Sequence, residues 1–209
     1  MTYLNPSDAV AQQENLTCQI FDELRNKTFD GIGVTRASNG DGEQVARDIM
    51  AKVATEIGLV VEDDAAGNVY MTLKGTKTGA KPVIIGSHID SVAQGGNFDG
   101  AAGVVSGLIA CASLIETGVT PSCDVKVMGI RAEESAWFGV SYIGSRSALG
   151  TLPPEALEKA KRVDTGLSLY DHMRSAGCNP DDLKEGNVFL PPNSPVSYTH
   201  LTLPTKRIV

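Results

Sequence analysis

Two short segments of the chain hold residue types that could do chemistry together. The first carries His88, Asp90 and Asp99, an imidazole and two carboxylates, and the second is the glutamate pair Glu133-Glu134. Imidazole nitrogen combined with carboxylate oxygen is a ligand set that suits zinc, manganese or cobalt. The two segments therefore predict a divalent metal site, provided that the fold brings them together.

Both segments directly follow apolar runs of the kind that form buried strands. Residues 83–85 precede His88, and residues 125–130 precede the glutamate pair. Side chains two apart at a strand end point the same way, so Asp90 could accept the second N–H of the His88 imidazole. Adjacent glutamates point in different directions, so one could bind metal while the other moves protons. If the two strands are neighbours, both segments lie at the carboxyl edge of the sheet, where open α/β sheets bind ligands.

Each of these groups also has an ordinary structural interpretation. A single histidine near a strand end is usually hydrogen-bonded, an Asp-Gly after glycines is usually a turn, and adjacent glutamates are usually solvated. The conjunction of the two segments favours metal chemistry. Elsewhere, His172 is expected to be a solvated helix residue. Arg146 could bind a substrate carboxylate, form a structural ion pair or make a helix-end contact. Trp137-Phe138 is expected to pack beneath the site.

The surrounding pattern predicts an α/β fold, with a mixed, mainly parallel sheet sandwiched by helices. Helices are expected over residues 9–27, 42–57, 100–117, 155–162 and 167–176, with a further helix-bearing segment at 135–150. Strands are expected at residues 59–62, 69–73, 83–85 and 125–130. The chain order of these elements places both acidic segments at strand ends.

Composition narrows the classes of partner. Hydrophobic residues at 42% and charged residues at 21% are ordinary for a globular protein. The net charge of −7 argues against nucleic acid or an anionic membrane as partner. No apolar run approaches the roughly 18 residues of a membrane span, and the N-terminal residues do not form a secretory signal. The four cysteines stand far apart and are expected to be small buried residues of a cytoplasmic chain.

The same two segments resemble a known family. The stretch GSHIDSVAQGGNFDGAAGVVSGL, followed by AEESAWFGVSYIGSR, closely resembles the hydantoinase/carbamoylase family of metal-dependent amidases, relatives of the aminoacylase-like dinuclear metallopeptidases. The resemblance extends from about residue 29 to residue 190. It implies that residues 1–190 are the N-terminal part of a zinc-peptidase-like catalytic domain. The implied reaction is hydrolysis of a linear carbamoyl or ureido C–N bond, in an N-carbamoyl-L-amino acid or allantoate, by a metal-activated water.

The resemblance also implies roles for individual residues and two divalent metal ions, zinc, manganese or cobalt. His88 resembles a ligand of one metal, Asp99 the carboxylate that bridges both, and Glu134 a ligand of the second. Glu133 resembles the general base of catalysis, and Asp90 the partner that orients the histidine. In the family the bridging aspartate is often followed by a strained cis peptide bond, which is therefore expected after Asp99.

The sequence departs from the family pattern after Leu190. The family has further ligands in a His-Ile-Glu-Gln-Gly segment and in a late histidine, whereas here the remaining histidine is His200. Residues 191–209 lack helical and strand periodicity and are interpreted as an unstructured, foreign tail. The family's dimerisation and lid domain is not recognised, so a homodimer is expected only for a longer version. A di-metal aminopeptidase or deacylase, or a catalytically incompetent metal-binding fragment, stays open as an alternative.

Overall fold

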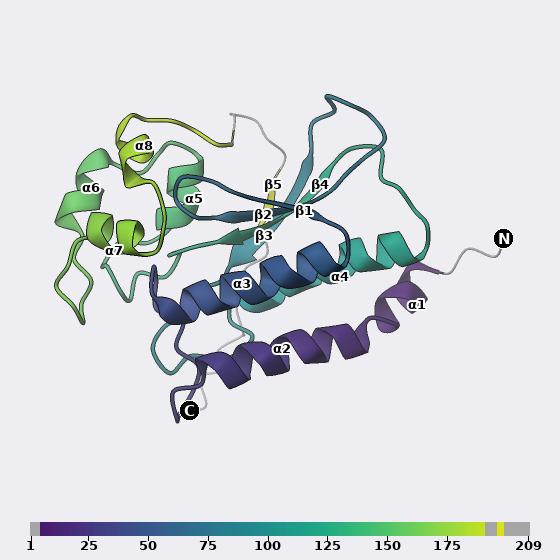
Figure 1. Ribbon diagram of the computed structural model, residues 1–209, viewed down its shortest axis with the longest axis horizontal. Coiled ribbons are helices and arrows are strands. Elements are labelled where there is room, and N and C mark those ends of the chain that lie inside the picture. The colour runs from purple at the N-terminus through teal and green to yellow at the C-terminus, as the bar shows by residue number, and fades with distance from the viewer. Residues whose placement is uncertain (1–4, 191–195, 199–209) are drawn as a thin grey trace, which may run out of the picture.

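The computed structural model describes residues 5–190 and 196–198 of the chain (Figure 1). The strands are, in chain order, β1 (Val60–Asp63), β2 (Val69–Leu73), β3 (Val83–His88), β4 (Val125–Ile130) and β5 (Val196–Tyr198). The helices are α1 (Pro6–Ala11), α2 (Glu14–Thr28), α3 (Asp41–Glu56), α4 (Ala101–Glu116), α5 (Ile143–Ala148), α6 (Pro154–Lys159), α7 (Leu169–Ser175) and α8 (Pro180–Lys184). The predicted α/β class is confirmed.

The strands form one mixed sheet with the order β1-β2-β4-β3-β5. The pairs β1–β2 and β2–β4 are antiparallel, whereas β3 runs parallel to both β4 and β5. The sheet is therefore mixed, as predicted, but its described pairings are divided evenly between the two directions. In the parallel register His88 lies opposite Ile130. Both acidic segments consequently leave the sheet at the same edge.

Helices α3 and α4 pack on one face of the sheet, and α2 packs on the outer side of these two helices (Figure 1). Strand alternation sends Met71 and Val127 into the core beneath these helices, where they contact apolar residues of α3 and α4. Gly107 lets α4 approach closely, because a Cβ at this position would lie 2.8 Å from the Val127 side chain. No helix in the described part of the chain, α4 included, is long and apolar enough to cross a bilayer. Close packing of α4 places its N-terminal end beside the end of β3.

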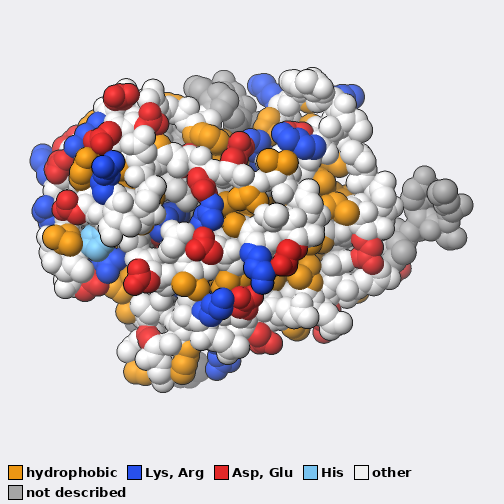
Figure 2. Space-filling view, viewed as in Figure 1, with side chains coloured by type: hydrophobic (Ala, Val, Ile, Leu, Met, Phe, Trp, Pro, Cys, Tyr) orange, Lys and Arg blue, Asp and Glu red, His pale blue; other side chains and the backbone are white. Residues whose placement is uncertain are grey.

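The opposite face of the sheet carries a smaller core. It consists of Tyr70, Ile84, Met128, Ile130, Ala148 and Leu190. A third cluster joins the short helices α5 to α8, which Figure 1 shows as a group at one end of the sheet. Charged side chains of both signs are interspersed on the face seen in Figure 2. The two acidic segments lie where the main sheet meets the group of short helices.

The predicted N-terminal helix is two helices in the structure. Helix α1 packs against α4, whereas α2 packs against α3, so the chain changes direction between Ala11 and Glu14. Helix α8 was not predicted, because five residues are too few to show a helical period. Of the cysteines expected to be buried, Cys18 is exposed and Cys123 is partly exposed.

Three residues of the predicted tail form a strand. Val196–Tyr198 pair in parallel with residues 84–86 of β3, so the expectation of an unstructured tail is wrong for these residues. The outer edge of β3 presents backbone N–H and C=O groups that can pair with a further strand. His200 lies outside the described residues, and the foreign origin of the tail stays a prediction.

Candidate metal centre

Three side chains from three separate segments converge at the carboxyl edge of the sheet. His88 ends β3, Asp99 precedes α4, and Glu134 follows β4. The His88 Nε2 atom lies 3.9 Å from Asp99 Oδ1 and 3.9 Å from Glu134 Oε1, and one ligand atom of each residue lies within 4.8 Å of the others. Ligand atoms that share an ion at about 2 Å lie within about 4 Å of each other. The two distances from His88 Nε2 meet this limit, and a small movement of the two carboxylates toward each other would let all three side chains hold one divalent cation.

The hydrogen bonds of His88 determine which nitrogen faces the carboxylates. Its Nδ1 lies 2.9 Å from the backbone oxygen of Asp90 and 3.3 Å from the Asp90 carboxylate. Both are acceptors, so Nδ1 carries the proton and Nε2 presents its lone pair to Asp99 and Glu134. Burial lowers the pKa of His88, but the hydrogen bond and charge of Asp90 outweigh burial, so that the pKa is raised.

A tight turn at Gly100 connects Asp99 to α4. Gly100 has a φ of 63° and a ψ of −54°, and the Ala101 N–H donates to the Asp99 carbonyl at 2.6 Å, which is a γ-turn. A Cβ at residue 100 would lie 2.5 Å from the His88 ring. The cis bond expected after Asp99 is wrong, because all peptide bonds in the described residues are trans. Because glycine can adopt a positive φ, the chain turns at Gly100 into α4 with all bonds trans.

The segment that carries the glutamates is held by its backbone. Four consecutive N–H groups each donate to a buried side-chain oxygen. The pairs are Arg131 N with Asn68 Oδ1 (2.9 Å), Ala132 N with Glu43 Oε1 (2.8 Å), Glu133 N with Asp90 Oδ1 (3.1 Å) and Glu134 N with Asp90 Oδ2 (3.1 Å). Ala132 has a φ of 52°, a left-handed conformation that non-glycine residues seldom adopt. These hydrogen bonds offset the cost of that conformation.

Asp90 is the point where the two acidic segments meet. Its carboxylate is fully buried and also accepts a hydrogen bond from the Ser38 hydroxyl at 2.7 Å. The sequence predicted that Asp90 would orient His88. It did not predict that the same carboxylate would bind the backbone of both glutamates. One side chain thus sets the relative position of the imidazole, Glu133 and Glu134.

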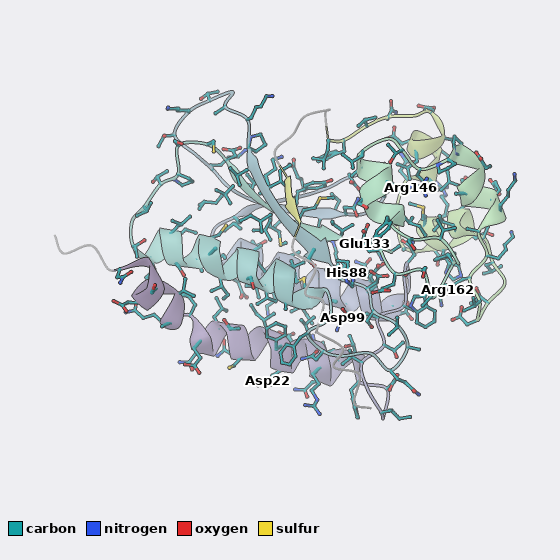
Figure 3. All side chains as sticks on the ribbon, turned by 180° about the vertical axis from the view of Figure 1, so that it is seen from behind. Asp22, His88, Asp99, Glu133, Arg146 and Arg162 are labelled. Carbon is teal, nitrogen blue, oxygen red and sulfur yellow. The ribbon has the colours of Figure 1, made fainter. Side chains whose placement is uncertain are left out.

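The two adjacent glutamates point to different places. Glu133 is buried, and its Oε1 accepts a hydrogen bond from the Ser145 backbone N–H at 2.8 Å, whereas Glu134 faces His88. Burial raises the pKa of Glu133, although the hydrogen bonds from Ser145 oppose that rise. Glu133 also borders a largely apolar cavity of about 290 Å³ between β4 and α5. Figure 3 shows His88, Asp99 and Glu133 gathered at one end of the sheet.

Comparisons with known proteins identify relatives of this chain. Peptidase family M28 matches residues 68–169. The chain is 40% identical to an N-carbamoyl-L-amino acid amidohydrolase of Geobacillus stearothermophilus, over 85% of this chain and 42% of that protein. It is 35% identical to an allantoate amidohydrolase of Bacillus subtilis, over 62% of this chain and 32% of that protein. An amidase of the hydantoinase/carbamoylase family from Burkholderia multivorans superposes with a TM-score of 0.72 at 30% identity, over 78% of this chain and 40% of that structure.

The chain belongs to the hydantoinase/carbamoylase family of amidases. Sequence identity and structural likeness both lead to this family, so the predicted resemblance is confirmed. The chain spans less than half the length of the relatives it matches. Its mixed sheet with flanking helices is the fold of the matching part of those amidases.

Two fully buried charged residues beside the candidate site were not predicted. Arg36 is fully buried and donates to backbone oxygens of the segment between His88 and α4. Glu43 of α3 is also fully buried, and its carboxylate lies 2.6 Å from the Arg131 guanidinium. Both residues occur in polar stretches of the sequence, where a charged side chain is normally solvated. The sequence contains no signal that separates them from surface residues.

Three other residues considered from the sequence have structural partners. His172 is not solvated as expected: it is 9% exposed, its Nε2 lies 2.7 Å from the Thr165 hydroxyl, and its ring contacts Phe138 edge-on at 5.6 Å. His172 is buried because α7 packs into the third cluster, among the short helices. Arg146 makes the helix-end contact, donating to the Thr151 carbonyl at 3.2 Å. Trp137 is buried and donates to a backbone oxygen of the segment after β3 at 2.7 Å.

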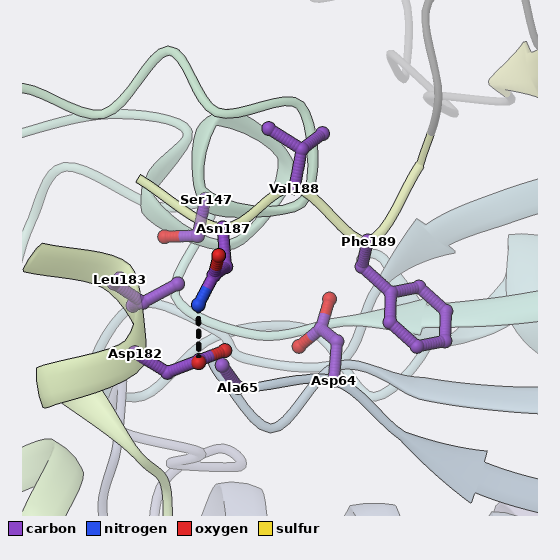
Figure 4. A pocket seen from close by; sticks show the side chains of 8 residues that line it. All are labelled: Asp64, Ala65, Ser147, Asp182, Leu183, Asn187, Val188 and Phe189. Atoms are coloured by element: carbon purple, nitrogen blue, oxygen red, sulfur yellow. Dashed lines mark hydrogen bonds between the residues drawn. The ribbon is translucent and has the colours of Figure 1, made fainter. Parts of the chain in front are cut away.

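A smaller cavity lies away from the candidate metal ligands, between the β1–β2 turn and the segment after α8 (Figure 4). Its volume is about 90 Å³, and the Asp64 carboxylate forms part of its wall. That carboxylate already accepts hydrogen bonds from the Asn68 amide and the Tyr70 hydroxyl, while Asn187 donates to Asp182 across the cavity. The Asp64 carboxylate is therefore engaged in holding the turn, and Asp182 and Asn187 are engaged with each other.

Proposed function

We propose that this protein is a metal-dependent amidohydrolase that cleaves a linear carbamoyl or ureido C–N bond. The observation that carries the proposal is the convergence of His88, Asp99 and Glu134 within 4.8 Å. The names of the relatives supply the substrate class, and the 40% identical relative favours an N-carbamoyl-L-amino acid over allantoate. The proposed partner is accordingly a small ureido or carbamoyl compound.

The proposed metal ligands are His88 through Nε2, Asp99 and Glu134. A divalent cation bound there supplies Lewis acidity, which polarises a carbonyl group and makes a water molecule more acidic. Asp99 would be the carboxylate shared by two ions, because it has two oxygens and its side chain is 34% exposed, in contrast to the buried His88. Zinc, manganese and cobalt all accept this mixture of nitrogen and oxygen ligands.

Glu133 is the proposed general base. Its carboxylate is next to a proposed metal ligand in sequence but points elsewhere. Burial raises its pKa despite the opposing Ser145 hydrogen bonds, which is the direction of shift that suits a general base. In the proposed reaction Glu133 takes a proton from the attacking water and returns it to the departing nitrogen. Asp90 keeps His88 and the glutamate backbone in place during these transfers.

The adjacent glutamates offer a matched test of this assignment. We expect Glu133→Gln to lower kcat about 10²- to 10⁴-fold on an N-carbamoyl-L-amino acid, with metal affinity kept within about twofold. Glu134→Gln should instead weaken metal binding, measured by calorimetry, about 10- to 100-fold. Wild-type turnover by Glu133→Gln at saturating metal would exclude the general-base role. Equal metal affinity in both variants would exclude Glu134 as a ligand.

A peptidase or deacylase is the second candidate, favoured by the match to peptidase family M28 over residues 68–169. Assays of N-carbamoyl amino acids, allantoate, N-acyl amino acids and dipeptides under one set of conditions separate the two. Preferred cleavage of a dipeptide would replace the amidohydrolase proposal. Metal binding without turnover on any of these compounds would instead favour the metal-binding fragment.

We further propose a cytoplasmic setting, and a homodimer for a longer version of the protein. The four cysteines are all free, which supports a reducing compartment. The net charge of −7 supports a small-molecule substrate over nucleic acid or an anionic membrane surface.

A further inference from the structure

Arg36 is a fully buried arginine whose guanidinium binds only backbone oxygens. Its Nε donates to the Ile89 carbonyl at 2.8 Å, its Nη2 to the Asp99 carbonyl at 2.8 Å, and its Nη1 lies 3.5 Å from the Asn97 carbonyl. No carboxylate lies within ion-pair distance of it in the described part of the chain. Burying a charged group without an ionic partner costs free energy of folding. The hydrogen bonds to carbonyl oxygens offset part of this cost, so we ask what this arrangement contributes to the protein.

The three carbonyl groups belong to one segment and span its two ends. Ile89 is the first residue after β3, and Asp99 is the first residue of the γ-turn that leads into α4. Arg36 itself is held by Ser91, which accepts from the Arg36 N–H at 3.0 Å and donates its own N–H to the Arg36 carbonyl at 2.9 Å. The fork therefore fixes the separation of the two ends of the loop.

The contact with Asp99 is the one that bears on the site. The Asp99 carbonyl accepts from both Arg36 Nη2 and the Ala101 N–H, so the peptide group after Asp99 is held from two directions. The Asp99 side chain makes no such contact with Arg36 and stays directed toward His88 Nε2, 3.9 Å away. The arginine thus fixes the main chain and leaves the carboxylate available.

We propose that Arg36 is a positioning residue of the metal centre, which holds the Asp99 backbone so that the Asp99 carboxylate reaches a cation bound by His88. The inference rests on the proposed function, since it takes Asp99 to be a metal ligand. A lysine does not replace this arginine, because a single ammonium group lacks the planar fork that reaches several carbonyl groups at once.

Cobalt titration of the 209-residue chain tests the proposal, with calorimetry for affinity and visible absorption for ligand geometry. We expect Arg36→Lys and Arg36→Met to lower cobalt affinity about 10- to 100-fold, the range seen when a residue that orients a ligand is lost, and to change the absorption spectrum. Arg47→Lys is the matched control, because Arg47 pairs with Asp63 and does not touch the loop. It should bind cobalt as the wild type does.

A double-mutant cycle with Asp99→Asn separates positioning from general destabilisation. If Arg36 acts through Asp99, Arg36→Lys changes cobalt affinity by less than about twofold in the Asp99→Asn background. Equal fold losses in both backgrounds would overturn the inference, as would an Arg36→Lys variant with wild-type affinity and spectrum. If Arg36→Met does not fold, the Lys variant and the cycle still decide. A wild-type chain that binds no cobalt would overturn the proposed metal site, and with it this inference.

Discussion

The two segments that converge on the candidate metal centre are fixed in opposite ways. In the segment after β3, three carbonyl oxygens are held by one side chain, the Arg36 guanidinium. The segment after β4 is held through its N–H groups by three acceptors, Asn68, Glu43 and Asp90. One guanidinium has five donors in a single fork, whereas a carboxylate or amide accepts at only one or two atoms. Holding four N–H groups therefore takes side chains from several elements.

This difference has consequences for stability. The acceptors of the second segment come from α3, from the residue before β2 and from the segment after β3. They tie three parts of the fold to the end of β4, so their loss should affect the whole domain. Arg36 ties together two ends of one loop, and its loss should affect mainly the site. Asp90 belongs to the first segment and holds the second, which makes it the link between the two.

Glu43→Ala should have the largest effect on stability. It removes the acceptor of the Ala132 N–H and leaves the buried Arg131 guanidinium without its carboxylate. Breaking a buried ion pair on one side costs about 3–5 kcal/mol. Urea denaturation of the metal-free protein measures this loss, and Gln44→Ala, which removes a partly exposed contact to Arg131, is the control. A loss below about 1 kcal/mol would show that the second segment is not tied to the domain in this way.

Asp90→Asn should affect both segments at once. The amide oxygen can still accept hydrogen bonds, but the NH₂ group would face an N–H or hydroxyl group that now donates to Asp90. We expect a loss of about 2–3 kcal/mol in unfolding free energy. We also expect weaker metal binding, because His88 loses the carboxylate beside Nδ1. Unchanged metal affinity alongside reduced stability would confine Asp90 to the second segment.

Gly100→Ala tests how tightly the segment after β3 is packed against His88. Alanine must adopt a φ of 63° there, and its Cβ would meet the His88 ring at 2.5 Å. Gly118→Ala is the matched control, since Gly118 has a φ of 70° with no atom near the added Cβ. The control should lose only about 1 kcal/mol of backbone strain, whereas Gly100→Ala should lose about 1–3 kcal/mol more and bind cobalt less tightly. Equal losses in thermal unfolding would mean that His88 moves aside freely.

The sequence predicted the strands and the site better than the groups that hold the site. Strand β2 and strand β4 have their predicted bounds, because apolar runs with clear ends carry a strong signal. The two acidic segments could be located from the residues because both follow apolar strand-like runs, whereas the family resemblance selected His88, Asp99 and Glu134 as the ligands within them. Arg36 and Glu43 could not be chosen, since burial of a charged residue depends on contacts 53 and 88 residues away in the chain. The γ-turn at Gly100 could not be predicted either, because the need for glycine there depends on the nearby His88 ring, which only the folded structure shows.

Glu133→Gln should give the smallest change in stability, and one that depends on pH. Burial raises the folded-state pKa of Glu133 above its unfolded value, so the wild type is most stable, with respect to this group, below the ordinary pKa of a glutamate. That contribution is lost as pH rises through the raised folded-state pKa. Glutamine does not ionise, so the variant should gain stability relative to the wild type across this window and then keep a constant difference. Urea denaturation of the metal-free proteins from mildly acidic to neutral pH measures it. A difference that does not vary with pH would mean that the Glu133 carboxylate is as well stabilised in the fold as in water, which would remove the electrostatic support for its proposed role in proton transfer.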